Sequence, residues 1–217
     1  MERVSHLPAG HAQLIRHLCG SGVLRTPAII QAFIDVDRRN FTPDEFKDQA
    51  YEDIAITIAP GSSLSQPSTV AFMLELLQPR PNNRVLEVGA GSGYQTALLA
   101  HLVGPAGVVY AIEVQPNIAS IHRANLEPCN LPHVSCIEGD GSKGIPEHAP
   151  FDRIIVAAAA SHIPQDMRAQ LAVGGRLVVP VGNDTQDVVV LMRLSDQEYD
   201  EERYPGFSFV PLIELET

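Results

Sequence analysis

The chain contains 217 residues, 45% of them hydrophobic and 19% charged, a composition typical of a globular protein with one sizeable core. Its formal net charge is −11, which argues against a general nucleic-acid binder and against binding to an anionic membrane. Three irregularly spaced cysteines predict neither a disulfide framework nor a zinc site, and the histidines show no metal-ligand pairing. We therefore expect no bound metal. The N-terminus lacks the pattern of a secretory signal, so we expect a cytoplasmic protein.

Two amphipathic helices are predicted ahead of the main sheet, as an N-terminal helical extension. Apolar residues recur at helical spacing in residues 11–19 and 27–36. Residues 40–52 are expected to be irregular because a proline within them breaks any helix. After them we expect a short strand in residues 51–59, a turn at Pro60-Gly61, a polar loop SSLSQPS and a helix over residues 70–77.

From residue 84 onward, short apolar runs alternate with helical segments. This alternation predicts an α/β fold with a doubly wound, mostly parallel sheet that helices cover on both faces. Gly174-Gly175 is expected to end the last helix and lead into a strand. The predicted strands are residues 84–88, 108–113, 134–138, 154–157, 176–180, 187–194 and 208–215, and the predicted helices are residues 95–103, 116–126 and 164–171.

A glycine turn follows the first strand of this sheet. In the stretch VLEVGAGSGYQTALLA, Gly89, Gly91 and Gly93 separate an apolar run from a segment of good helix formers. Glycines let a ligand approach the backbone, and a helix N-terminus offers free N–H groups, so the pattern is typical of a nucleotide-binding turn. Glu113 ends the next strand, where a carboxylate either accepts two ribose hydroxyls or is simply solvated. The topology places these residues in one crevice at the carboxyl ends of the strands.

The turn fits both NAD and S-adenosylmethionine, and its surroundings favour the second. The spacing G-x-G-x-G departs from the G-x-G-x-x-G that a pyrophosphate prefers, and no phosphate-binding Lys or Arg lies near the turn. Glu87, two residues before the turn, would repel a pyrophosphate but attract the ammonium of a methionine moiety. Asp140, in the run EGDGSKG, can accept the amine of adenine. Carboxylates at three successive strands suit a cofactor with a cationic sulfonium and an amino-acid tail.

Six segments along most of the chain share a recognisable pattern: VDRRNFTP, YEDIAITIAPGSSLSQPSTVAFMLELL, VLEVGAGSGYQTALLA, IEGDGSKGIPEHAPFDRIIVAAAA, IPQDMRAQLAVGGRLVVPVGN and FVPL. In this order they resemble the protein-L-isoaspartate O-methyltransferase family of Rossmann-like class I methyltransferases. SLSQP and the terminal FVPL are not general methyltransferase features. The resemblance implies methyl transfer from S-adenosylmethionine to the free α-carboxylate of L-isoaspartyl residues in damaged proteins and peptides, which initiates repair through a succinimide. We expect a monomeric single domain over residues 1–217, with the helices and substrate loop in 1–78 and the cofactor-binding sheet in 79–217.

The resemblance also implies roles for individual residues. Ser65 matches the family's active-site serine, although its position alone favours an ordinary turn or N-cap serine. Its hydroxyl is expected to donate to one carboxylate oxygen and so orient the other toward the methyl group. No general base is required, because a carboxylate is already ionised at pH 7. The expected cofactor-binding residues are Glu87, Gly89, Gly91, Glu113, Asp140 and Gly141, and the expected substrate-binding residues are Ser63, Leu64 and Val210.

The substrate segment departs from the family pattern. Ser62 and Ser63 stand where the family usually has a longer side chain and a threonine, as in GQTIS. Two alternatives therefore stay open: a methyltransferase acting on an aspartate carboxylate of a specific peptide partner, and a cofactor-binding module without turnover. Arg38-Arg39 is either an anchor for a substrate carboxylate or a solvated surface pair. His162 is expected to be a loop residue rather than a catalytic one.

Overall fold

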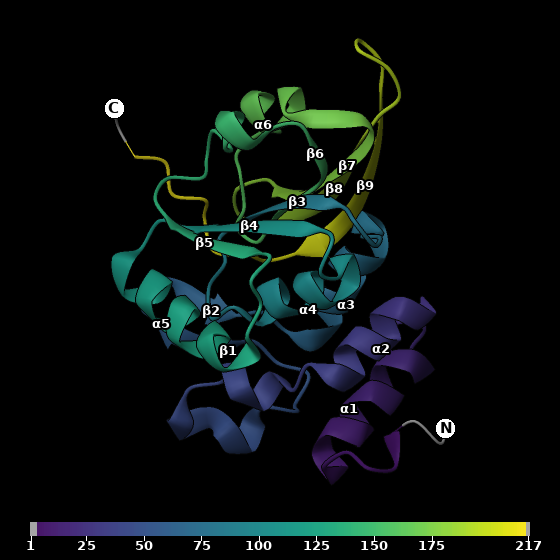
Figure 1. The fold of residues 1–217 in the computed structure, drawn as a ribbon, viewed down its shortest axis with the longest axis vertical. Coiled ribbons are helices and arrows are strands. Elements are labelled where there is room, and N and C mark those ends of the chain that lie inside the picture. Colours follow the sequence, from purple (N-terminus) through teal and green to yellow (C-terminus); the bar gives the residue numbers. More distant parts are fainter. Residues whose placement is uncertain (1–3, 216–217) are drawn as a thin grey trace.

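A seven-stranded sheet lies at the centre of the structure, a computed structural model that describes residues 4–215 (Figure 1). Its strands are β3 (Arg84–Val88), β4 (Val108–Glu113), β5 (Val134–Glu138), β6 (Phe151–Val156), β7 (Leu171–Val181), β8 (Gln186–Arg193) and β9 (Tyr199–Phe207). They follow the order β5-β4-β3-β6-β7-β8-β9, with β5 to β7 parallel and the last two strands antiparallel. The prediction of a mostly parallel α/β sheet is confirmed.

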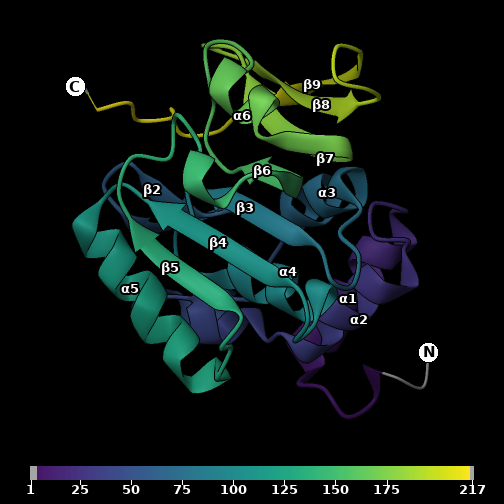
Figure 2. The same ribbon diagram turned by 45° about the horizontal axis from the view of Figure 1, so that its top comes forward.

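Helices cover both faces of this sheet (Figures 1 and 2). One face carries α3 (Pro67–Leu77), α4 (Tyr94–Val103) and α5 (Pro116–Leu126), which continues into η4 (Glu127–Cys129). The other face carries the shorter α6 (Gln165–Ala169) and η5 (Pro146–His148). Successive strand residues point to opposite faces, so Val85 and Ile155 join one hydrophobic cluster while Leu86 and Ile154 join the other. The sheet is therefore doubly wound, as predicted.

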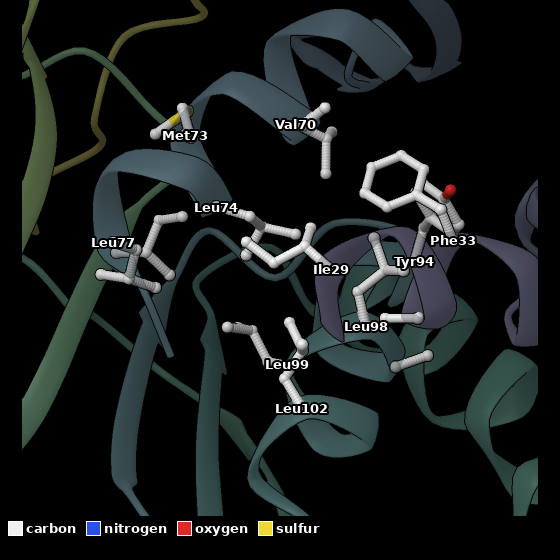
Figure 3. Packing of buried hydrophobic residues seen from close by; sticks show 14 of the residues in the cluster. Ile29, Phe33, Val70, Met73, Leu74, Leu77, Tyr94, Leu98, Leu99 and Leu102 are labelled. Carbon is white, nitrogen blue, oxygen red and sulfur yellow. The ribbon is translucent and has the colours of Figure 1, made fainter. Parts of the chain in front are cut away.

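The N-terminal elements pack on the helices rather than on the sheet. They are α1 (Ala9–Gly20), α2 (Pro27–Asp35), η2 (Arg38–Phe41), η3 (Asp44–Gln49), β1 (Ile56–Ala59) and β2 (Ser62–Leu64). Figure 3 shows Ile29 and Phe33 of α2 next to Leu74 of α3 and to Tyr94 and Leu98 of α4. All five side chains belong to one buried cluster that also includes strand residues. The helical extension therefore shares its core with the main sheet.

Two local predictions are wrong, one for the polar run before α3 and one for the glycine pair after α6. The polar run SSLSQPS is not simply a loop, because its first three residues form β2 and pair antiparallel with β1 across the predicted Pro60-Gly61 turn. The last helix ends at Ala169, and Gly174-Gly175 lies inside β7. A Cβ on Gly175 would lie 2.8 Å from the carbonyl oxygen of Ala172, so the glycine permits a close backbone approach within the strand.

The end of the chain also differs from the prediction. Residues 208–215 form no strand, although Pro211 makes an isolated bridge with Ala159. The strand next to β8 at this edge of the sheet is instead β9, whose sequence YDEERYPGF is largely exposed. Charged residues and a proline are typical of edge strands, where one side of the backbone faces solvent. The apolar residues after β9 leave the sheet and cross to its carboxyl edge, where they contribute to a cleft.

Candidate active site

A cleft opens at the carboxyl ends of β3 and β4, where the sequence predicts a crevice. Three segments supply most of its wall: the turn after β3, the β1–β2 hairpin with the residues that follow it, and residues 210–213. We call it the carboxyl-end cleft. The predicted site residues that line it are Ser63, Leu64, Ser65, Glu87, Gly89, Gly91, Glu113, Gly141 and Val210. Asp140, the remaining one, lies beside Gly141 but outside the lining.

The glycine turn holds its shape through left-handed backbone conformations. Gly91 has φ 55°, a left-handed conformation that favours glycine, and a Cβ built on it would lie in van der Waals contact with Ile58 at 3.9 Å. Gly93 serves another purpose: with φ 90° it precedes α4, and a Cβ there would lie 3.0 Å from His122 on α5. The third glycine therefore permits close packing of α5 against the turn.

Glu113 holds the glycine turn in place. One carboxylate oxygen, Oε2, accepts the N–H of Gly91 at 3.0 Å, and the other, Oε1, accepts the N–H of Gln115 at 3.0 Å. The residue is only 6% exposed. A carboxylate oxygen offers two acceptor positions, so each oxygen keeps one for a ligand hydroxyl. The alternative of a solvated strand end is wrong, because the carboxylate is buried and bound to the turn.

Glu87 is fully buried at the base of the cleft. Gln95 Nε2 donates to its Oε1 at 3.0 Å, and the Thr96 hydroxyl donates to its Oε2 at 2.5 Å. Burial raises the pKa of Glu87 to about 7, although these two donors favour the ionised form. Thr96 Oγ1 also lies 3.0 Å from His122 Nε2, and burial lowers the pKa of His122 to about 4. A neutral His122 therefore completes a buried hydrogen-bond chain to Glu87.

The hydrogen-bond chain from His122 through Thr96 to Glu87 was not predicted from sequence. Gln95 and Thr96 come from the first turn of α4, and His122 comes from α5, 26 residues beyond Thr96. Only the position of Gln95-Thr96 directly after the glycine turn offered a signal, since the first turn of that helix faces the strand end.

Asp140 and Gly141 follow β5 at the adenine side proposed from the sequence. Asp140 Oδ1 accepts the N–H of Ser142 at 2.8 Å, and Oδ2 accepts the N–H of Leu215 at 2.9 Å. Burial alone would raise the pKa of Asp140, but these donors outweigh it and lower that pKa. A Cβ on Gly141 would lie 2.6 Å from Ile112 Cγ2, so the chain passes close over the core there.

The β1–β2 hairpin presents Ser63, Leu64 and Ser65 to the carboxyl-end cleft. Among residues 4–215, the Ser65 hydroxyl has no hydrogen-bond partner, so it is available to a ligand. Val210 reaches the same cleft because its carbonyl oxygen accepts the N–H of Ala159 at 2.8 Å. The predicted catalytic and substrate-binding residues thus come together, although they lie more than 140 positions apart in sequence.

Arg38 and Arg39 differ, and neither interpretation made for the pair describes Arg38. Its side chain is fully buried and donates to main-chain carbonyl oxygens, so it is neither solvated nor open to a substrate carboxylate. Arg39 is exposed. His162 lies in an exposed loop after β6, with Nδ1 2.9 Å from the Ser161 hydroxyl, and does not line the cleft.

Comparison with known proteins identifies the family. Residues 9–217 match the model of the family described as protein-L-isoaspartate(D-aspartate) O-methyltransferase. The chain belongs to this family. A protein-L-isoaspartate O-methyltransferase from Aeropyrum pernix is 44% identical over 203 residues, covering 93% of this chain and 78% of the relative. One from Methanoregula boonei is 47% identical over 197 residues, covering 90% of this chain and 88% of the relative.

Solved structures of the protein-L-isoaspartate O-methyltransferase family share the fold. One such enzyme superposes with a TM-score of 0.84 at 29% identity, over 93% of this chain and 65% of that chain. A putative member from Plasmodium falciparum, solved in complex with S-adenosyl-L-homocysteine, superposes with a TM-score of 0.83 at 24% identity, over 94% of this chain and 98% of that chain. The Rossmann-like methyltransferase fold expected from the sequence is confirmed.

Within residues 4–215 no helix is both long enough and apolar enough to cross a membrane. The same residues include no group of three or more His, Cys, Asp or Glu side chains placed to hold a metal ion.

Proposed function

We propose that this chain transfers a methyl group from S-adenosylmethionine to the free α-carboxylate of L-isoaspartyl residues in damaged proteins and peptides. The observation that carries the proposal is the meeting of two segments in one cleft: the glycine turn with Glu113, and the hairpin that leads into Ser65. Family membership supports the same activity, because the relatives that bear this name match most of the chain. The methyl ester would close to a succinimide and begin repair.

The residues of the carboxyl-end cleft fit this cofactor. Gly91 lines the cleft without a side chain of its own, and each oxygen of Glu113 keeps an acceptor position for a ribose hydroxyl. The carboxylate of Asp140 adds negative charge toward a cationic ligand, and Glu87, with a pKa of about 7, adds negative charge to the extent that it is ionised. When bound, the cofactor would supply an electrophilic methyl group on a cationic sulfur. We propose Glu87, Gly89, Gly91, Glu113, Asp140 and Gly141 as its binding residues.

Ser65 is the proposed catalytic residue. Its unpartnered hydroxyl can donate to one oxygen of the substrate carboxylate and leave the other oxygen to act as the nucleophile. The described lining of the cleft contains no His, Lys or Arg, and an ionised carboxylate requires no base. The work of this chain is therefore alignment and exclusion of water. Ser63, Leu64 and Val210 are proposed to contact the peptide around the reacting residue.

One observation favours a second acceptor. Ser62 and Ser63 both line the cleft and are shorter than the side chains usual in the family, which leaves more room beside Ser65. A methyltransferase acting on an aspartate side chain of a specific peptide partner would also fit such a site. A module that binds the cofactor without turnover is the other alternative.

A peptide panel separates these functions. Two peptides of one sequence, with isoaspartate or aspartate at the same position, are incubated with the chain and S-adenosylmethionine labelled in its methyl group. We expect label in the isoaspartyl peptide alone. Label in the aspartyl peptide would favour the second acceptor. Cofactor binding by calorimetry without any transfer would favour the binding module, and the absence of both would refute the cofactor assignment.

Three further proposals concern the setting of the activity. We propose that residues 1–217 act as one methyltransferase domain, which is supported by the buried cluster shared by α1, α2 and the sheet. A net charge of −11 supports proteins and peptides rather than nucleic acid or an anionic membrane as partners. Cys19, Cys129 and Cys136 are free thiols, as expected in a reducing cytoplasm, and we propose that the chain works there as a monomer.

A further inference from the structure

Arg38 is a buried cation without a carboxylate partner. Its side chain has no exposed surface, and among residues 4–215 it forms no ion pair. Burial lowers the pKa of Arg38 to about 10, so the guanidinium remains charged at pH 7. Its Nε also lacks a hydrogen-bond partner within the described residues. Burying a charge in this way is unfavourable unless its donors are well used, so the contacts of Arg38 are informative.

Those contacts bring together the two ends of the β1–β2 hairpin. Nη2 donates to the carbonyl oxygen of Ile54, which precedes β1, and to that of Ser65, which follows β2, both at 3.1 Å. Nη1 donates to the carbonyl oxygen of Ala50 at 2.7 Å. A single nitrogen therefore joins the entry and the exit of the hairpin. Such bonds from a charged planar donor are directional and strong.

The hairpin lies outside the main sheet, so contacts with other segments must hold it. Within residues 4–215, β1 and β2 pair only with each other, and an isolated two-stranded hairpin is marginally stable in water. Ile56 and Leu64 anchor it in the hydrophobic core, and the bonds of Arg38 fix its two ends. A second set of bonds crosses its base, from Gln66 Nε2 to the Asp53 carbonyl and from the Ser68 N–H to the Asp53 carboxylate. These bonds act after Ser65, whereas Arg38 holds the main chain of Ser65 itself.

The segment that carries Arg38 is itself fixed. Asp37 accepts a hydrogen bond from the Tyr51 hydroxyl at 2.9 Å, and the Tyr51 ring stacks on His11 with ring centroids 5.3 Å apart. The Thr42 hydroxyl donates to the Arg38 carbonyl oxygen at 3.0 Å. The guanidinium is therefore presented from a rigid base, and it can define where the hairpin lies.

We propose that Arg38 is a positioning residue for Ser65: its guanidinium fixes the ends of the β1–β2 hairpin so that the Ser65 hydroxyl faces the carboxyl-end cleft. The proposal rests on the proposed function, because it takes Ser65 to be the group that orients the acceptor carboxylate. Arg38 does not itself line the cleft, and its hydrogen-bond partners include Ser65 but none of the proposed cofactor-binding residues, so we expect it to act on the acceptor side.

Hydrogen–deuterium exchange tests the structural half of the proposal without any assay of activity. Arg38→Lys keeps the charge but loses the planar fork, and Arg39→Lys, at the exposed neighbouring position, is the matched control. We expect faster exchange of main-chain amides in residues 54–65 in Arg38→Lys, unchanged exchange in β3 to β5, and no change in the control. Unchanged exchange in residues 54–65 would overturn the proposal whether or not the chain methylates isoaspartyl peptides.

Kinetics test the catalytic half. We expect Arg38→Lys to lower kcat for an isoaspartyl peptide by roughly 10- to 100-fold, as displacement of a reacting group does, while the calorimetric Kd for S-adenosylmethionine stays within about twofold. In the Ser65→Ala background the same substitution should have little further effect, because Arg38 acts through Ser65. If Arg38→Lys lowered kcat by the same factor in both backgrounds, or weakened cofactor binding as much as it lowered kcat, Arg38 would have a general structural role and the proposal would be overturned. Inactivity of the unaltered chain would instead count against the proposed function.

Discussion

Glu113→Gln is the substitution that tests the cofactor site most sharply. In the structure both carboxylate oxygens accept a main-chain N–H, one from Gly91 and one from Gln115, each at 3.0 Å. Glutamine has nearly the same shape but only one acceptor oxygen. Its amino group must face one of the two N–H donors, so one contact to the loop is lost and one acceptor position for the ribose is lost with it.

The size of the effect follows from this geometry. A hydrogen bond to an ionised group contributes about 1.5–3 kcal/mol, and removing a single ribose contact of about 2 kcal/mol weakens binding roughly 30-fold. We therefore expect the Kd for S-adenosylmethionine, measured by isothermal titration calorimetry, to rise roughly 30-fold. At saturating cofactor kcat should change much less, because the acceptor side of the cleft is unaltered.

The control for this experiment is Glu138→Gln. Glu138 is the register partner of Glu113 on β5, but its side chain is exposed, forms an ion pair with Arg123 and does not line the cleft. We expect this control to bind the cofactor as the unaltered chain does. A Kd for Glu113→Gln within twofold of that control would refute the placement of the ribose at Glu113.

Three other substitutions test separate parts of the account. Ser65→Ala should lower kcat by roughly 10- to 1000-fold and leave the calorimetric cofactor Kd unchanged; equal loss of both would mark Ser65 as structural. Glu87 has a folded pKa raised to about 7, so the folded state holds its proton more tightly than the unfolded state and the unfolding free energy should fall as the pH rises from about 5 to about 8. In urea titrations Glu87→Gln should remove up to about 3 kcal/mol of that fall. If the unfolding free energies of the variant and of the unaltered chain fell equally with pH, the result would contradict the claim that burial raises the pKa of Glu87. Gly141→Ala places a Cβ 2.6 Å from Ile112 Cγ2 and 2.8 Å from Val88 Cγ1, so it should lower the unfolding free energy by about 1–3 kcal/mol; an unchanged urea midpoint would contradict the packing described here.

The parts of the fold that sequence predicts well are those where local pattern and tertiary burial agree. β3, β4 and β5 match their predicted bounds residue for residue: β3 and β4 are mostly buried apolar runs in a parallel sheet, and β5 is a half-buried strand that pairs with β4. β9 was missed because an exposed edge strand carries charged residues and gives no apolar signal. Residues 208–215 were mistaken for a strand because their apolar side chains face a cleft rather than a sheet neighbour.

The site residues also fall into those that the sequence predicts and those that it does not. Glu87 and Glu113 could be placed at one edge because parallel strands bring their carboxyl ends together. The role of Arg38 could not be predicted, since its partners are carbonyl oxygens, which every residue carries and which leave no mark in a sequence. Thr96 and His122 escaped notice because their contact depends on how α5 packs against the glycine turn.

The central claim is that the carboxyl-end cleft selects an isoaspartyl carboxylate as the methyl acceptor. Its most direct measurement is a competition in one tube, in which the chain and S-adenosylmethionine act on an equimolar mixture of an isoaspartyl peptide and its aspartyl isomer, resolved by chromatography and mass spectrometry. We expect the mass of one added methyl group on the isoaspartyl peptide, followed by its succinimide, and an unaltered aspartyl isomer. Methylation of the aspartyl isomer at an equal or higher rate would contradict the central claim.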